Sequence, residues 1–260
     1  MLILFLQVLS LLGPWHDAAP SATPMPGRAP RTLAVLNFDN NTGKADYDPM
    51  GRGIAAMMIT DLATSPDLKL VERERMQDIL DEQKMSRTPM FDSTTAAKVG
   101  RLLGAEFIVT GSLAASTPEL RIDMRVIKVE TGQIVKTARA TGNEDKFFEI
   151  EQKLADDVLK DLDIALSPES AALLEKRREA DRQLGYAAFK SLSNAFVAME
   201  RHDYATAATQ LQPLMMRSPD SRVVQLAYQE AKHRAAAAAT EAAAKKVGDA
   251  LKGLIKKPPR

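Results

Sequence analysis

The sequence predicts an α/β fold: a three-layer domain in which a mixed five-stranded sheet carries helices on both faces, followed by an all-α C-terminal region. Residues 33–38 (LAVLNF) are almost continuously apolar, which is typical of a strand buried on both faces. Residues 120–126 alternate apolar and charged side chains, the period of a half-buried strand. Beyond Ser167-Pro168 only helical spacing is found.

These patterns predict four segments. Residues 1–30 form a signal peptide and linker, 31–166 an α/β domain, 167–235 a helical hairpin, and 236–260 a basic amphipathic C-terminal helix.

Composition excludes several classes of function. The 260 residues carry a formal net charge of +1, so no overall charge attracts nucleic acid, and we expect no nucleic-acid partner. The chain has no cysteine, which excludes disulfides, thiolate metal sites and a cysteine nucleophile. We expect no cofactor.

The first segment favours export. Leu2–Gly13 is apolar but too short to span a bilayer, and small residues follow it at Ala18, Ala19, Ser21 and Ala22. We interpret it as a secretory signal before a Pro- and Ala-rich linker, Pro14–Pro30. No Lys or Arg precedes the run, so a cytosolic amphipathic start remains an alternative.

The α/β domain begins with a strand–helix–strand unit. Strands are expected at Leu33–Phe38 and Leu68–Glu72, parallel to each other because a helix separates them. Asp48 is expected to cap that helix, with Pro49 at its first position. Two further helices are expected before the third strand, one marked by Met76, Ile79 and Leu80 and one capped by Asp92 and carrying Ala96, Val99 and Leu103.

Three antiparallel strands and a closing helix complete the domain. They are expected around Phe107–Val109, Leu120–Val126 and Ile134–Thr141, with Gly104 and Gly132 in left-handed conformations. The alternation of apolar and charged residues shifts by one position at Ile127 and Val129, which predicts a bulge or a second covered face of the sheet there. Apolar residues then recur every three or four positions over 145–166, indicating an amphipathic helix.

The C-terminal region is expected to be helical throughout. Residues 173–201 are expected to be helical, and a last helix runs from Ser221 through an Ala-rich stretch. One tetratricopeptide-like spacing is present, at Ala195, Asp203, Tyr204, Ala207, Leu211 and Pro219. Because arrays of that type usually need several repeats, the hairpin should pack on a neighbour or on the sheet domain.

Two ligand motifs are rejected. Residues 51–56 match G-x-G-x-x-A, but about a dozen residues separate the first strand from Gly51, too many to place glycine backbone against a pyrophosphate. The glycines instead allow close packing of the helix start. The acidic loop at 39–48 lacks the Gly and Glu of a calcium loop. The three histidines lie far apart in the sequence, and no catalytic constellation is found, so we predict no enzyme activity and no metal site.

The end of the chain is the candidate contact site. Residues 231–260 contain eight basic and two acidic residues, a net charge of +6. Such a helix suits an anionic membrane surface or an acidic partner, although a solvated helix end would look the same. The predicted contact residues are Lys245, Lys246, Val247, Leu251, Lys252, Leu254, Ile255, Lys256 and Lys257.

Residues 33–166 resemble the CsgG family, the curli production assembly and transport component, and more distantly the amino-terminal domain of TolB. The resemblance rests on LAVLNF, Val71-Glu72-Arg73, Leu103-Gly104-Ala105 and the turn Glu130-Thr131-Gly132, in order and spacing. It implies a periplasmic, outer-membrane-associated, non-enzymatic protein of secretion or assembly. The family's namesake is a lipoprotein that forms a ring-shaped pore. This chain lacks the lipidated cysteine, and residues 114–119 and 142–144 leave no room for pore-forming hairpins.

We therefore predict an envelope accessory in outer-membrane secretion or curli-like surface-structure assembly, acting through protein–protein interaction. Its expected partners are envelope or secretion proteins, a second copy of itself and an anionic membrane surface. Two alternatives remain: an oligomeric secretion-pore subunit, and a cytoplasmic regulatory module with TolB-like and tetratricopeptide-like parts.

Overall fold

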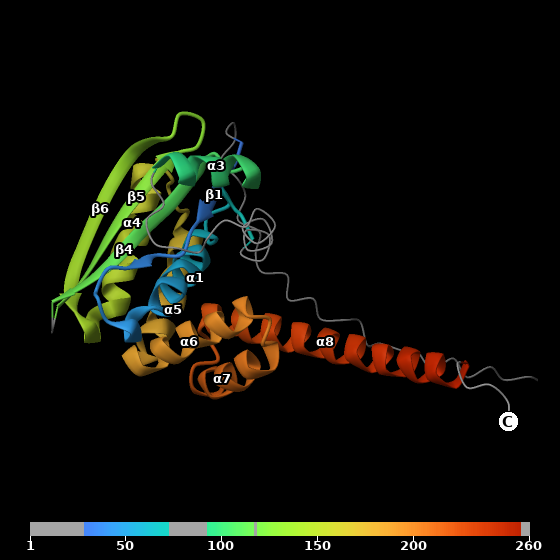
Figure 1. Ribbon diagram of the computed structural model, residues 1–260. Helices are drawn as coiled ribbons and strands as arrows, with labels where there is room; N and C mark the ends of the chain where they lie inside the picture. The colour runs from blue at the N-terminus through green and yellow to red at the C-terminus, as the bar shows by residue number, and fades with distance from the viewer. Residues whose placement is uncertain (1–28, 73–92, 117–118, 256–260) are drawn as a thin grey trace, which may run out of the picture.

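A mixed sheet forms the centre of the protein (Figure 1). The computed structural model describes residues 29–72, 93–116 and 119–255. The strands lie in the order β3-β1-β4-β5-β6. β1 is parallel to β3 and β4, and β4, β5 and β6 are antiparallel neighbours. The strand bounds are β1 Arg31–Val35, β2 Asp39–Asn40, β3 Leu68–Leu70, β4 Phe107–Ser116, β5 Glu119–Lys128 and β6 Gln133–Asn143.

The first expected strand, Leu33–Phe38, ends earlier than predicted, and a second short strand begins in the stretch expected to be a loop. β1 ends at Val35, and the two-residue strand β2 then pairs with the far half of β4, opposite Ser112 and Leu113. Leu36 and Phe38 between them remain buried. The predicted five-stranded mixed sheet is confirmed, with β2 as a short sixth strand.

Helices cover both faces of the sheet, as predicted. α1 and α4 pack on one face, in a core with Leu33, Val109 and Ile122, and α3 covers part of the other face above Ala34 and Ile108. The α-helices described are α1 Met50–Leu62, α3 Ser93–Leu103, α4 Phe147–Asp161, α5 Pro168–Arg182, α6 Gly185–Glu200, α7 Tyr204–Arg217 and α8 Arg222–Ile255, with short 3₁₀ helices η1 Ala45–Tyr47 and η2 Glu144–Lys146.

The glycines at the start of α1 serve packing. A Cβ on Gly51 would lie 1.8 Å from the carbonyl oxygen of Phe38, and one on Gly53 would lie 2.2 Å from Ser193 Oγ. The helix start therefore rests directly on the backbone after β1 and against α6. This confirms the close-packing interpretation of the G-x-G-x-x-A match.

The antiparallel strands follow the predicted pattern closely. Gly104 and Gly132 have φ of 67° and 70°. The register slips between Val126 and Ile127, leaving Val135 of β6 as the extra residue of a bulge. Ile127 and Val129 are also buried under α3 on the second face, so both expectations for this point are confirmed.

Two local predictions are wrong, and one needs detail. Asp48 does not cap α1, whose N-cap is Pro49; the Asp48 carboxylate accepts a hydrogen bond from Asn40 instead. The helical structure expected over 173–201 is confirmed as two helices, separated by a turn at Gly185 with φ of 75°. The closing helix ends at Asp161 rather than Leu166, since Asp163 is left-handed with φ of 50°.

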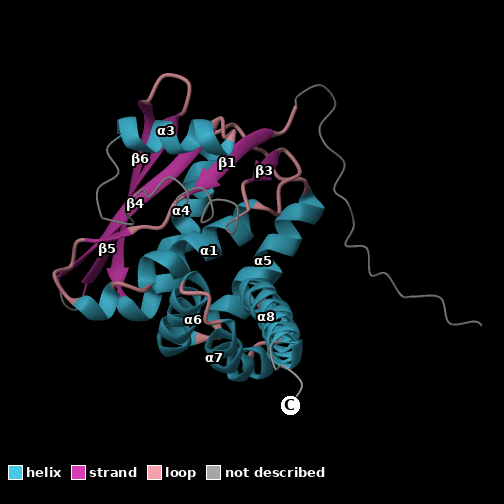
Figure 2. Ribbon diagram, turned by 45° about the vertical axis from the view of Figure 1, so that its right-hand side comes forward, coloured by secondary structure: helices cyan, strands magenta, loops and turns pink. Residues whose placement is uncertain are grey.

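The C-terminal helices share the core of the sheet domain. α6 packs against α1 (Figure 2), so of the two placements predicted for the hairpin, on a neighbour or on the sheet domain, the structure shows the second. Phe147 of α4 stacks on Phe189 of α6 with ring centroids 3.8 Å apart. The helical region is therefore seated on the α1 and α4 layer through a continuous apolar contact.

Some predictions fall outside the described residues: the signal segment, the helix near Met76–Leu80, the Asp92 cap, and Lys256 and Lys257. Within the described ranges, no helix has both the length and the apolar character needed to cross a membrane.

Candidate functional site

The helix α8 has a buried root. Val223, Val224, Ala227 and Ala231 recur at helical spacing and are at most 4% exposed. They face α7, with further contacts to α1, α5 and α6. Ser221 Oγ accepts a bond from the Val224 amide and so helps to cap the helix, which starts one residue after the predicted position.

Beyond Ala231 the same helix leaves the body of the protein (Figure 1). Every described side chain from Lys232 to Val247 except Ala235 is exposed. The helix continues to Ile255, so this projecting arm, residues 232–255, is about 36 Å long at about 1.5 Å per residue. Arg234 at the start of the arm pairs with Glu230 in the root.

Seven of the nine predicted contact residues belong to this arm; Lys256 and Lys257 lie outside the described residues. Lys245 and Lys246 are exposed, and Val247 is 60% exposed. Leu251, Lys252, Leu254 and Ile255 lie in its helical backbone. Their grouping on one face with Val247 stays a prediction from spacing, as does any contact that they make.

A buried ionic network joins the helical region to the sheet domain near the root of α8. Arg178 of α5 donates from Nε to Asp61 Oδ2 of α1 at 2.7 Å, and its NH1 lies 2.9 Å from Asp156 Oδ1 of α4. Arg178 also bonds the Gln152 carbonyl oxygen. Burial alone would lower the pKa of Arg178, but the two carboxylates raise it overall.

Two further carboxyl groups are buried in this network. Glu151 is 0% exposed, and neither carboxyl oxygen has a hydrogen-bond partner among the described residues. Burial and the nearby Asp61 raise its pKa well above the ordinary value. Burial also raises the pKa of Asp181 to about 7, against the opposing effect of a hydrogen bond from Ser221. Asp181 therefore titrates near neutral pH.

A second polar contact lies at the other end of α1. Glu200, the last residue of α6, accepts from Arg52 Nε at 2.6 Å and from Asn37 Nδ2 at 3.0 Å. Arg52 belongs to α1 and Asn37 follows β1. The helical region is thus held by charged contacts at both ends of α1, with the aromatic stack between them.

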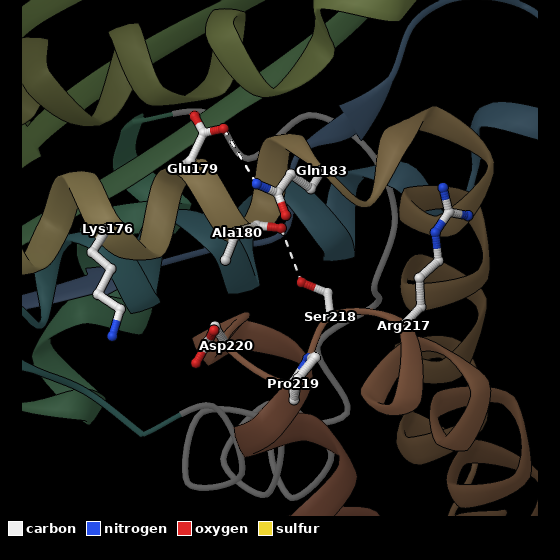
Figure 3. Close-up of a pocket in the computed structure, with 8 residues that line it drawn as sticks. All are labelled: Lys176, Glu179, Ala180, Gln183, Arg217, Ser218, Pro219 and Asp220. Carbon is white, nitrogen blue, oxygen red and sulfur yellow. Dashed lines mark hydrogen bonds between the residues drawn. The ribbon is translucent and has the colours of Figure 1, made fainter.

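A cavity of about 260 Å³ lies between α5 and the turn from α7 to α8 (Figure 3). Ser218 donates to the Ala180 carbonyl oxygen there at 3.0 Å. The cavity is lined by two basic residues, Lys176 and Arg217, and by two acidic residues, Glu179 and Asp220, so it carries both signs of charge. It selects neither anions nor cations, and in the described parts of the chain no group of three or more His, Asp or Glu side chains is placed to hold a metal.

The sequence analysis missed the buried network, although a signal was present. Glu151 falls four residues after Phe147 and three before Leu154, on the apolar face of α4. Arg178 and Asp181 follow Leu174 by four and seven residues, and Asp61 follows Ile54 by seven. Ionisable residues in phase with an apolar face indicate buried charges that need partners.

The comparisons with known proteins bear on the sheet domain. Residues 21–119 match the family model of the curli production assembly/transport component CsgG. A comparison with curated proteins gives no match. The match ends at the first residue of β5, so the resemblance over 120–166 stays a prediction from the sequence.

Three solved structures are similar to part of the chain. The LpoB C-terminal domain from Salmonella enterica is 17% identical, covering 45% of this chain and 86% of its own, with a TM-score of 0.39. PelC from Paraburkholderia phytofirmans, a dodecamer, is 16% identical; the match covers 55% of this chain and 96% of the PelC chain, with a TM-score of 0.35. TolB from Acinetobacter baumannii is 15% identical; the match covers 53% of this chain and 29% of the TolB chain, with a TM-score of 0.37. The resemblance to the CsgG family is thus confirmed by the family model over residues 21–119 of this chain.

Proposed function

We propose that this chain is a non-enzymatic accessory protein of the bacterial envelope that assists outer-membrane secretion or the assembly of a surface structure. It works through protein–protein contact, and the arm of α8 makes that contact. The CsgG match over residues 21–119 supports the secretion and assembly role. The observation that carries the contact role is the helix itself, which continues past the buried Ala231 with side chains that are exposed from Lys232 to Val247, except Ala235, where they are described.

The chemistry of the arm suggests the kind of partner. An exposed helix gains little stability from its own surface, and its apolar positions remain in water until a partner covers them. In the sequence, Lys245 and Lys246 precede Val247 and further lysines follow it, a composition that suits an acidic protein surface with an apolar centre. The same charge would suit an anionic membrane, and the two partners are separated by experiment.

The direct test is site-specific crosslinking in cells. A photoreactive residue at Val247 is compared with one at Met216 on α7, because both side chains are large, apolar and strongly exposed, at 60% and 79%. We expect an envelope protein to be captured from position 247 and not from position 216. Equal capture at both positions, or capture of cytosolic proteins alone, would contradict the proposal.

A vesicle assay distinguishes a membrane partner from a protein partner. Binding to phosphatidylglycerol vesicles is compared with phosphatidylcholine vesicles, for the full chain and for a deletion of residues 245–260. If the arm contacts a membrane, the full chain should bind the anionic vesicles only, and the deletion should abolish this binding. Salt should weaken it, since charges are screened over about 10 Å at about 0.1 M. Charge reversal of Lys98 and Lys176, both exposed on other helices, is the matched control for Lys245→Glu with Lys246→Glu.

A further inference from the structure

The network around Arg178 contains more buried carboxyl groups than it can pair. Three buried carboxyl groups, those of Asp61 on α1, Glu151 on α4 and Asp181 on α5, interact with the arginines of α5, and the exposed Asp156 of α4 joins them. Arg178 pairs with Asp61 and Asp156, Arg182 with Glu175 and Glu179 on its own helix, and Arg177 donates to Thr64. Glu151 and Asp181 are left without a paired cation among the described residues.

These two carboxyl groups have different surroundings. Glu151 faces the carboxylates of Asp61, Asp156 and Asp181 and one cation, Arg178. Asp181 faces Asp61, Arg177 and Arg182, and accepts a bond from Ser221 at the start of α8. A buried carboxylate with neither a cation nor a hydrogen-bond donor is unstable relative to its protonated form.

We propose that Glu151 and Asp181 form a proton-dependent latch that controls how firmly α5 and the root of α8 are held on α1 and α4. When both are protonated, they add no charge to the buried interface and the helical region docks firmly. When they lose their protons, like charges accumulate between α1, α4 and α5, and docking weakens. Because α8 starts at this interface, the position of its arm becomes sensitive to pH.

The direction of the effect follows from the titration of Asp181. Its pKa is about 7 in the docked structure against an ordinary value of 3.8. A raised pKa means that the docked state binds the proton more tightly, so the stabilisation is complete below the ordinary value and is lost as pH rises through about 7. One such group changes the docking equilibrium by up to about tenfold per pH unit within that window.

The test uses the full chain with two labels. The protein has no cysteine, so Thr137→Cys on β6 and Ala205→Cys on α7, both exposed, accept a fluorescence donor and acceptor at unique positions. Urea titrations at about pH 5 and about pH 8 follow the separation of the two labels. We expect the helical region to separate at lower urea at the higher pH.

Two variants identify the groups responsible. Glu151→Gln combined with Asp181→Asn should abolish the difference between the two pH values, whereas Asp156→Asn should keep it, because Asp156 is 58% exposed. Equal midpoints at both pH values in the unsubstituted, labelled chain would overturn the latch, and this comparison requires no change in the network. A full pH difference in the double variant would also overturn it.

Discussion

Arg178 on α5 places its Nε 2.7 Å from Oδ2 of Asp61 on α1, and the two side chains are only 8% and 3% exposed. The pair therefore connects the helical region to the sheet domain at a point that solvent does not reach. A buried pair of this kind contributes mainly through the penalty that follows when one partner is removed, because the other charge then stays buried alone.

Replacing Arg178 should therefore destabilise the whole protein. We expect Arg178→Met to lower the free energy of unfolding by about 3–5 kcal/mol, as for other buried pairs that lose one partner. The matched control, Arg182→Met, removes an arginine that is 30% exposed and should cost about 0–1 kcal/mol. Urea unfolding followed by circular dichroism measures both. Equal losses would show that the Asp61 contact adds nothing beyond a surface pair.

A methyl group at Gly51 should also be poorly tolerated. The new Cβ would lie 1.8 Å from the Phe38 carbonyl oxygen, so α1 must move away from the backbone after β1. Overpacking of this kind costs about 1–3 kcal/mol and more where backbone must shift. Gly104→Ala is the comparison. Its φ of 67° is strained for alanine, but the space around it is open, so we expect this variant to lose about 1–2 kcal/mol of stability. Melting curves of both variants rank them, and a milder effect at Gly51 would refute the close approach.

The aromatic stack between α4 and α6 should hold the helical region in place. Phe189→Ala removes a fully buried ring 3.8 Å from Phe147 and should cost about 3–5 kcal/mol. Tyr204→Ala, at the half-buried start of α7, is expected to cost much less. Hydrogen exchange is the informative readout, since the Phe189 variant should lose protection in α6 and α7 before the sheet does. Uniform loss across the whole chain would argue against separate docking of these helices.

Much of the fold could be predicted because local signals agree with the tertiary contacts. The alternation over 120–126 gave the buried face of β5, and the phase slip at Ile127 coincides with the bulge at Val135 and with the contact to α3. Gly104 and Gly132 were recognisable because a helix end and a tight turn both need positive φ. Here sequence period and packing favour the same conformation.

The misses arise where the deciding contact is distant in sequence. Asp48 looks like a helix cap, but Asn40 binds its carboxylate across the loop. The helical spacing over 173–201 did not mark the turn at Gly185 that separates α5 from α6. At the candidate site, the sequence located the arm of α8 but not the network at its root, because Glu151 and Asp181 differ from solvated carboxylates only by their tertiary surroundings.

The envelope assignment is tested most directly by cell fractionation combined with sequencing of the mature N-terminus. An exported protein predicts recovery in the periplasmic or outer-membrane fraction, with a first residue between Ala19 and Met25, after one of the small residues there. Recovery of the full-length chain in the cytosol, still beginning at Met1, would contradict the account.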